Sequence, residues 1–225
     1  ERFSFDGDIY QIPETTIRPQ ARHKGDVTTR IKAAFSTKAS AQMAAENGLG
    51  QMFVSGDDLP AMTAQVRQFN QIRADLGMEP DQPTTLLWMY CAETESEAEE
   101  GWEYFHNQLT AAQHHYFEWN NPGFEGVHGY EEYLERQAAD VGVADASLAA
   151  RRETQPIGTP DEIIDKIKTV QHAISLEMLV VHMFYGGMPR EKAEKSLRLF
   201  AEKVLPAVQA MPTPLNPDSL GVSTD

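Results

Sequence analysis

Four segments of the sequence share the same order of an apolar run, a turn and an amphipathic helical pattern. The apolar runs lie at residues 29–37, 50–56, 84–94 and 177–184. Strands that alternate with helices of this length predict an α/β fold, in which helices cover a parallel sheet. Unbroken apolar runs such as "LLWMY" are typical of parallel strands that are buried on both faces. Four such units form either an open sheet or half of an eight-stranded barrel, and the pattern is compatible with both.

Capping residues and glycines predict where the helices begin and end. Hydroxyl and carboxylate side chains accept hydrogen bonds from the first free amides of a helix, and glycine commonly follows the last turn. The predicted starts are residues 36–37, residues 57–58 and the capping box of Thr159, Pro160 and Glu162, and the predicted ends are Gly48 and Gly77.

The sequence predicts one partial domain rather than two complete ones. Two stretches do not follow the repeat, and the longer of them, at residues 119–157, has the length expected of an insertion or a lid. The expected parts are an extended lead-in at 1–28, three βα units at 29–118, the insertion at 119–157, a capped helix with the last strand and helix at 158–210, and a fraying tail at 211–225.

Composition excludes several classes of protein. The chain has 19 Lys and Arg against 34 Asp and Glu, a net charge of −15, which repels the phosphates of nucleic acids. No apolar run approaches the roughly 18 residues of a membrane span, and the first residues lack the apolar core of a signal peptide. Cys91 is the only cysteine, so the simplest expectation is a reducing, cytoplasmic location without a disulfide.

Two strand-to-helix junctions are candidate anion sites. The first, "FSTKAS", places Thr37 and Ser40 at a helix start, where free amides and the helix dipole favour a phosphate. The second, "FVSGDD", places Ser55 and Gly56 one βα unit later, so in a parallel barrel the two junctions are neighbours. Hydroxyl side chains at helix starts are also ordinary caps, and both interpretations stay open.

The last strand ends at Gly186 and Gly187, which permit either a tight turn or close approach of a ligand. Alternate residues of this strand point to opposite faces, so Phe184 or Tyr185 is expected to lie at the carboxyl-terminal mouth. The sequence does not decide which of the two faces is inward. His182, within an apolar strand, is expected to be a core histidine.

No metal site or familiar hydrolase or kinase motif is present. His106, His114 and His115 lie on one predicted helix without the i, i+4 spacing of two zinc ligands, and no cysteine–histidine pattern accompanies them. The sequence contains no G-x-S-x-G, no P-loop and no G-x-G-x-x-G. Hydrolases and nucleotide kinases are therefore not supported.

Three passages resemble the luciferase-like, flavin-dependent monooxygenase family. "RFSFDGDIYQIPETTIRPQ" is similar to the segment before the family's fifth strand, and "STKASAQMAAENGLGQMFVSG" to its fifth and sixth βα units. The third passage, "IGTPDEIIDKIKTV" through "FYGGMPREKAEKSLRLFAEKVLP", is similar to the family's carboxyl-terminal signature. The resemblance covers nearly all of residues 1–210 and is weak over 119–157. It implies the C-terminal half of a (β/α)8 TIM barrel, with the first four strands outside this sequence.

The resemblance also implies a cofactor and partners. Relatives bind reduced FMN, use O2 as co-substrate and receive electrons from a flavin reductase. Positions that hold the FMN phosphate in relatives correspond to Thr37, Ser40, Val54 through its backbone, and Ser55. The catalytic acid or base is not identified, because most residues around the flavin ring belong to the other half. A deazaflavin-dependent oxidoreductase and a catalytically inactive half-barrel or supporting subunit are the alternatives, and the substrate is an unknown small organic molecule.

A half-barrel has a physical problem that predicts a partner. Four strands leave two unpaired edges and one uncovered apolar sheet face, an unfavourable state in water. We therefore expect the chain to form a homo-oligomer or to pair with the missing N-terminal half.

Overall fold

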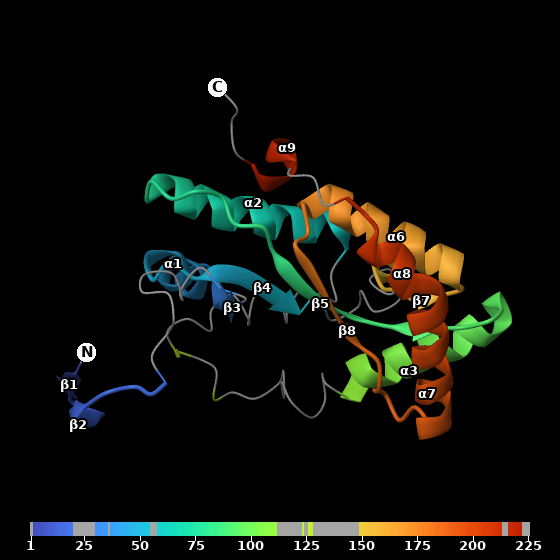
Figure 1. Cartoon of the computed structure of the whole chain (residues 1–225), viewed down its shortest axis with the longest axis horizontal. Helices are drawn as coiled ribbons and strands as arrows, with labels where there is room; N and C mark the ends of the chain where they lie inside the picture. The colour runs from blue at the N-terminus through green and yellow to red at the C-terminus, as the bar shows by residue number, and fades with distance from the viewer. Residues whose placement is uncertain are drawn as a thin grey trace.

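A parallel sheet of four strands forms the centre of the computed structural model. The structure describes residues 2–19, 30–35, 37–54, 58–111, 123, 126–127, 149–212 and 216–221. The strands lie in the order β3 (Lys32–Ala34), β4 (Gly50–Val54), β5 (Thr84–Trp88) and β8 (Met178–His182), and every pair is parallel (Figure 1). The predicted α/β class and the four predicted strands are confirmed.

Helices α1 (Lys38–Glu46), α2 (Leu59–Asp75) and α6 (Pro160–Ile174) cover one face of this sheet. Phe53 of β4 packs with Met62 and Val66 of α2, and Leu179 of β8 packs against the same cluster and against that of α6. Met62 and Val66 therefore lie on the sheet-facing side of α2.

The predicted helix limits agree with the structure. Thr37 and Asp58 are the N-caps of α1 and α2. Thr159 and Glu162 form the expected capping box at the start of α6. Gly48 and Gly77 directly follow the C-caps of α1 and α2. Local side-chain chemistry thus fixes where these helices begin and end.

The chain of β5 continues beyond the sheet as β6 (Tyr90–Cys91), which pairs with β7 (Ile157–Gly158). The two faces of this extension are covered by different helices. Met89 and Cys91 face α6 and the π-helical turn η4 (Phe200–Val204), whereas Tyr90 and Ala92 face α3 (Glu95–Ala111). In Figure 1, α3 and α6 lie on opposite sides of β7.

The sequence pattern predicts that α3 is the helix of a third βα unit and covers the sheet together with the other helices. The structure places it elsewhere. Trp102 and Phe105 of α3 pack against Tyr90 and Ile157, so the apolar side of the helix is buried on the strand extension. Because Trp88 and Tyr90 share a strand face, α3 lies on the side of the sheet opposite to α1 and α2, at the carboxyl-terminal end of the strands.

A long helical segment follows β8. It consists of α7 (Arg190–Leu199), η4 and α8 (Leu205–Gln209). Proline at 206 has no amide hydrogen for the carbonyl four residues earlier, and the wider π turn directly precedes it. Phe200 and Val204 are buried against α6.

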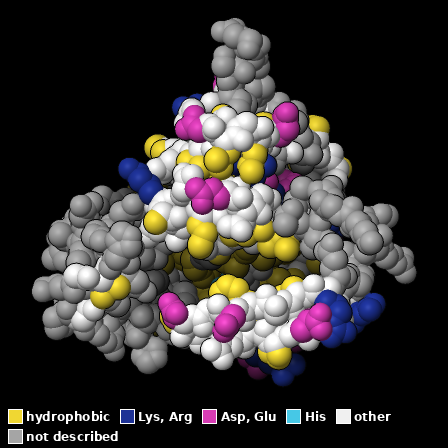
Figure 2. Space-filling view, turned by 90° about the vertical axis from the view of Figure 1, so that its left-hand side faces the viewer, with side chains coloured by type: hydrophobic (Ala, Val, Ile, Leu, Met, Phe, Trp, Pro, Cys, Tyr) yellow, Lys and Arg dark blue, Asp and Glu magenta, His cyan; other side chains and the backbone are white. Residues whose placement is uncertain are grey.

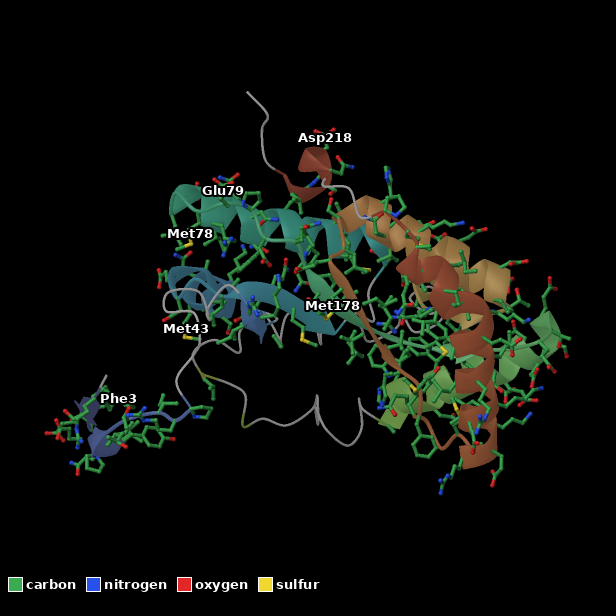
Figure 3. The ribbon with its side chains drawn as sticks, in the orientation of Figure 1. Phe3, Met43, Met78, Glu79, Met178 and Asp218 are labelled. Atoms are coloured by element: carbon green, nitrogen blue, oxygen red, sulfur yellow. The ribbon has the colours of Figure 1, made fainter. Side chains whose placement is uncertain are left out.

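The two ends of the chain contain elements that the sequence did not predict. The lead-in forms an antiparallel hairpin of β1 (Phe3–Asp6) and β2 (Gln11–Thr15), which stands away from the sheet (Figures 1 and 3). In the expected fraying tail, the short helix α9 (Pro217–Leu220) packs on α2 and α6, with Leu220 buried. The Asp218 carbonyl accepts hydrogen bonds from Arg67 of α2, so α9 is held against α2.

The predicted insertion at 119–157 falls largely outside the described residues, as do His114 and His115. Among the described helices, none has the length and apolarity needed to cross a membrane.

Candidate functional site

The sheet face opposite α1, α2 and α6 is largely apolar, and no described helix other than α3, at the carboxyl-terminal end, lies on that side. Residues paired in parallel register share a face, so Met52, Thr84 and Met178 form one row across it, and Trp88 and His182 another. The Met178 side chain, labelled in Figure 3, is 56% exposed, and Phe184 beyond the strand is 57% exposed. Figure 2 shows hydrophobic side chains lining a hollow on one side of the molecule. We call this sheet surface the inner face.

An ion-pair network lies at the amino-terminal end of the inner face. Lys32 Nζ lies 2.7 Å from Asp81 Oδ1 and 3.0 Å from Glu177 Oε2, and it donates a hydrogen bond of 2.8 Å to the Gln82 carbonyl. The second oxygen of Asp81 accepts a hydrogen bond from the Gln51 amide. Residues at this end of a barrel contribute to stability rather than catalysis.

The first predicted anion junction lies at the opposite, carboxyl-terminal end. Thr37 Oγ1 accepts a hydrogen bond of 3.3 Å from the Ser40 amide and lies 3.1 Å from Ser40 Oγ. Thr37 is therefore a helix cap, as one of the two interpretations expected. The Ser40 amide is used by this cap, and the two hydroxyls beside the helix start are half-buried. The helix dipole at such a start favours an anion. These groups fit a phosphate.

The second junction differs in charge from the first. The Asp58 carboxylate caps α2 by accepting a hydrogen bond of 2.9 Å from the Ala61 amide. A negative group thus already occupies the favourable end of the α2 dipole. Val54 ends β4, its side chain and all of Ser55 lie outside the described residues, and the role of both stays a prediction. The α1 start is consequently the better place for an anion.

The turn at Gly186 and Gly187 is filled by α3 rather than by an open gap. A Cβ atom at Gly186 would overlap the Tyr104 carbonyl of α3, and the Gly186 amide donates a hydrogen bond of 3.2 Å to Gln108 Oε1. Both glycines have positive φ, of 62° and 77°. Gly186 and Gly187 therefore form a tight turn, which was one of the two interpretations that the sequence left open.

Aromatic side chains gather beside that turn. The His182 ring centroid lies 6.4 Å from that of Trp88 and 5.7 Å from that of Tyr185. Trp88 Nε1 and Tyr185 Oη are buried without a hydrogen-bond partner. His182 is exposed on the inner face, so its prediction as a core histidine is wrong.

Neighbouring ionisable groups are held neutral by burial. Burial, with a smaller contribution from Glu100 and Glu97, raises the pKa of Tyr90 to about 12. Burial also raises the pKa of the Cys91 thiol to about 12, so this cysteine is not a ready nucleophile. The described residues contain no group of three or more His, Cys, Asp or Glu that could hold a metal ion.

The comparisons with known proteins concern both sequence and fold. Residues 1–176 match the family model described as luciferase-like monooxygenase. A search of curated proteins returns no match. The model match includes the start of the third passage, "IGTPDEIIDKIKTV", and ends before β8.

Three solved structures share the fold. EDTA monooxygenase from Chelativorans sp. BNC1 has a TM-score of 0.63 and 15% identity, and the match covers 99% of this chain and 55% of that one. Monooxygenase RslO1 from Streptomyces bottropensis has a TM-score of 0.60 and 22% identity, and the match covers 92% of this chain and 56% of that one. The third structure is the FMN complex of the oxygenating constituent of 3,6-diketocamphane monooxygenase, from the CAM plasmid of Pseudomonas putida. Its TM-score is 0.55 and its identity 18%, and the match covers 92% of this chain and 58% of that one. The chain thus spans little more than half the length of these relatives.

Proposed function

Because the chain belongs to the luciferase-like monooxygenase family, we propose that it is part of an enzyme that uses reduced FMN and O2 to oxidise a small organic substrate. When bound, reduced FMN supplies the electrons that activate O2. The expected setting is a reducing cytoplasm, where a flavin reductase provides the reduced cofactor.

The observation that carries this proposal is the direct pairing of β3 with β4. Their parallel register aligns Ala34 with Met52, so the two strands end next to each other at the carboxyl-terminal end of the sheet. Ligands of parallel α/β folds bind at this end. We assign the phosphate to the α1 amides with Thr37 and Ser40, and we assign supporting contacts to the Val54 backbone and Ser55.

Two serine variants test this assignment. In the full-length protein, Ser40→Ala and Ser55→Ala are each expected to raise the Kd of FMN about tenfold, because a hydrogen bond to a charged group is worth roughly 1.5–3 kcal/mol. Fluorescence titration measures the change. Ser4→Ala, on the exposed hairpin, is the matched control. Unchanged affinity in both junction variants would remove the proposed site.

Two alternatives give different results in simple assays. Titration with a deazaflavin cofactor, followed by absorbance, separates a deazaflavin-dependent oxidoreductase from an FMN enzyme. Oxygen uptake with reduced FMN separates an enzyme from a supporting subunit. We expect no uptake from the isolated chain, because most of the residues that surround the flavin ring in relatives lie outside it.

The open edges of the sheet support a second part of the proposal, namely pairing with four further strands. Neither β3 nor β8 has a second neighbour in the described part of the sheet. The Gly50 amide donates to the Ile31 carbonyl, so the peptide groups of Ile31 and Ala33 face β4 and those of Lys32 and Ala34 face the open edge. A second copy or an N-terminal half-barrel would pair there.

Ala34→Pro removes one amide of the open edge without touching the β3–β4 ladder. We expect the unchanged chain to elute as a dimer, or to bind a separately expressed N-terminal half. We expect Ala34→Pro to weaken either association at least tenfold, whereas Ala34→Val, which keeps the amide, does not. Size-exclusion chromatography with light scattering measures the mass. A stable, folded monomer at micromolar concentration that binds no complementary half would contradict the pairing.

A further inference from the structure

The inner face carries few groups that can form hydrogen bonds with a ligand. Apart from Lys32, His182 is the one titratable side chain among the described residues of its four strands. The Lys32 amine is already surrounded by three oxygen atoms at the far end. The remaining side chains are apolar or neutral. In the described strands, this face therefore offers a ligand an apolar surface with Lys32 at its amino-terminal end and His182 at its carboxyl-terminal end.

The His182 ring is held between two aromatic neighbours. Trp88 lies opposite it in the β5–β8 register, and the indole packs edge-on against Phe105 of α3 at 5.6 Å. Tyr185 is 5% exposed and packs with Tyr90 and Phe105 in the same cluster. Packing against α3 thus limits the movement of both neighbours of the exposed imidazole.

Both neighbours contain a buried donor without a partner. Among the described residues, neither Trp88 Nε1 nor Tyr185 Oη has a hydrogen-bond partner, and both atoms are covered by protein atoms. The exposed imidazole of His182 is therefore the polar group of this cluster that a ligand can contact.

From these observations, and resting on the proposed function, we infer that His182 binds the oxygen atom of a neutral, largely apolar substrate. The apolar inner face holds the hydrocarbon part, and the imidazole, which lies between the rings of Trp88 and Tyr185, fixes the position of the oxygen. This half of the site favours a neutral substrate over an anion, because the inner face has no unpaired cation among its described residues and the chain has a net charge of −15. Sulfonates and polycarboxylate chelators are thereby disfavoured.

The test uses the indole N–H signals of the protein labelled with 15N-tryptophan. The chain has three tryptophans, and Trp88→Phe assigns the signal of Trp88. We expect 2-undecanone to move the Trp88 signal and to leave that of Trp102, whose ring lies against Arg152 and Lys166. Undecane-1-sulfonate, below its micelle concentration, is expected to bind at least tenfold more weakly.

Histidine variants provide the second measurement. His182→Phe keeps an aromatic ring and is expected to weaken the ketone roughly fivefold to tenfold, in the range of one neutral hydrogen bond. His106→Phe, exposed on α3, is the matched control and should bind normally. A Trp88 signal that does not move at saturation, or equal affinity for the sulfonate, would overturn the inference. FMN titration of the same samples tests the proposed function independently of this inference, because the proposed phosphate position follows β3 and β4, whereas His182 lies on β8.

Discussion

Replacing Gly186 with alanine is expected to lower the free energy of unfolding by about 3 kcal/mol, because two costs add at this position. A non-glycine residue in the left-handed region costs about 1–2 kcal/mol, and φ of Gly186 is 62°. The new Cβ atom would also overlap the backbone carbonyl of Tyr104. A helix backbone moves less easily than the end of a side chain, so α3 must shift away from the turn.

Gly187→Ala is the matched control for this experiment. Its φ of 77° carries the same conformational cost, but no atom lies within 4 Å of the added Cβ. The control should therefore lose only about 1–2 kcal/mol. Urea denaturation followed by circular dichroism measures both variants. Equal losses in the two would show that contact with α3 contributes nothing and that the turn is held by its own conformation.

The strands and helix limits were predictable because their signals are local. The capping box at Thr159 and Glu162 needs only four residues, and the spacing of Met62 and Val66 identifies the buried side of α2 without any knowledge of its partner. The number of strands and their parallel direction followed from the repeated βα units. These features depend on residues that are close in the sequence.

The position of α3 could not be predicted in the same way. The pattern of Trp102 and Phe105 shows that one side of the helix is buried, but not which side of the sheet buries it. That choice depends on two contacts. An added Cβ at Gly101 of α3 would overlap the ring of Tyr90 in β6, so the helix backbone lies directly against this strand. In addition, β6 pairs with β7, which follows it by more than forty residues. Contacts between distant segments decide it.

His182 was misjudged for a related reason. The segment from Met178 to Tyr185 is apolar on both faces, so alternation alone could not show which set of residues points inward. Leu179 and Val181 pack against α6, which turns His182 to the open side. A more useful signal would have been the position of the histidine, at the last residue of a strand and just before a glycine turn, where barrel enzymes place functional groups.

The second large effect is expected at the amino-terminal end of the inner face. Lys32→Met is expected to destabilise the fold by about 3 kcal/mol, because removing one partner leaves a largely buried charge without compensation. The side chains of Lys32 and Asp81 are only 16% and 11% exposed. After the substitution, the Asp81 carboxylate keeps the Gln51 amide but loses its positive neighbour.

Two further variants show whether burial is the cause. Lys168→Met removes the Lys168–Asp165 pair, whose side chains are 57% and 76% exposed, and should change stability by less than about 0.5 kcal/mol. Adding Asp81→Asn to Lys32→Met removes the unpaired charge while the side-chain oxygen can still accept from Gln51. The double variant should therefore be more stable than Lys32→Met alone, as measured by the urea midpoint. If Lys32→Met and Lys168→Met lower the free energy of unfolding equally, the Lys32–Asp81–Glu177 network contributes no more than a surface ion pair. The sheet would then be stabilised mainly by the apolar cores around α2 and α6.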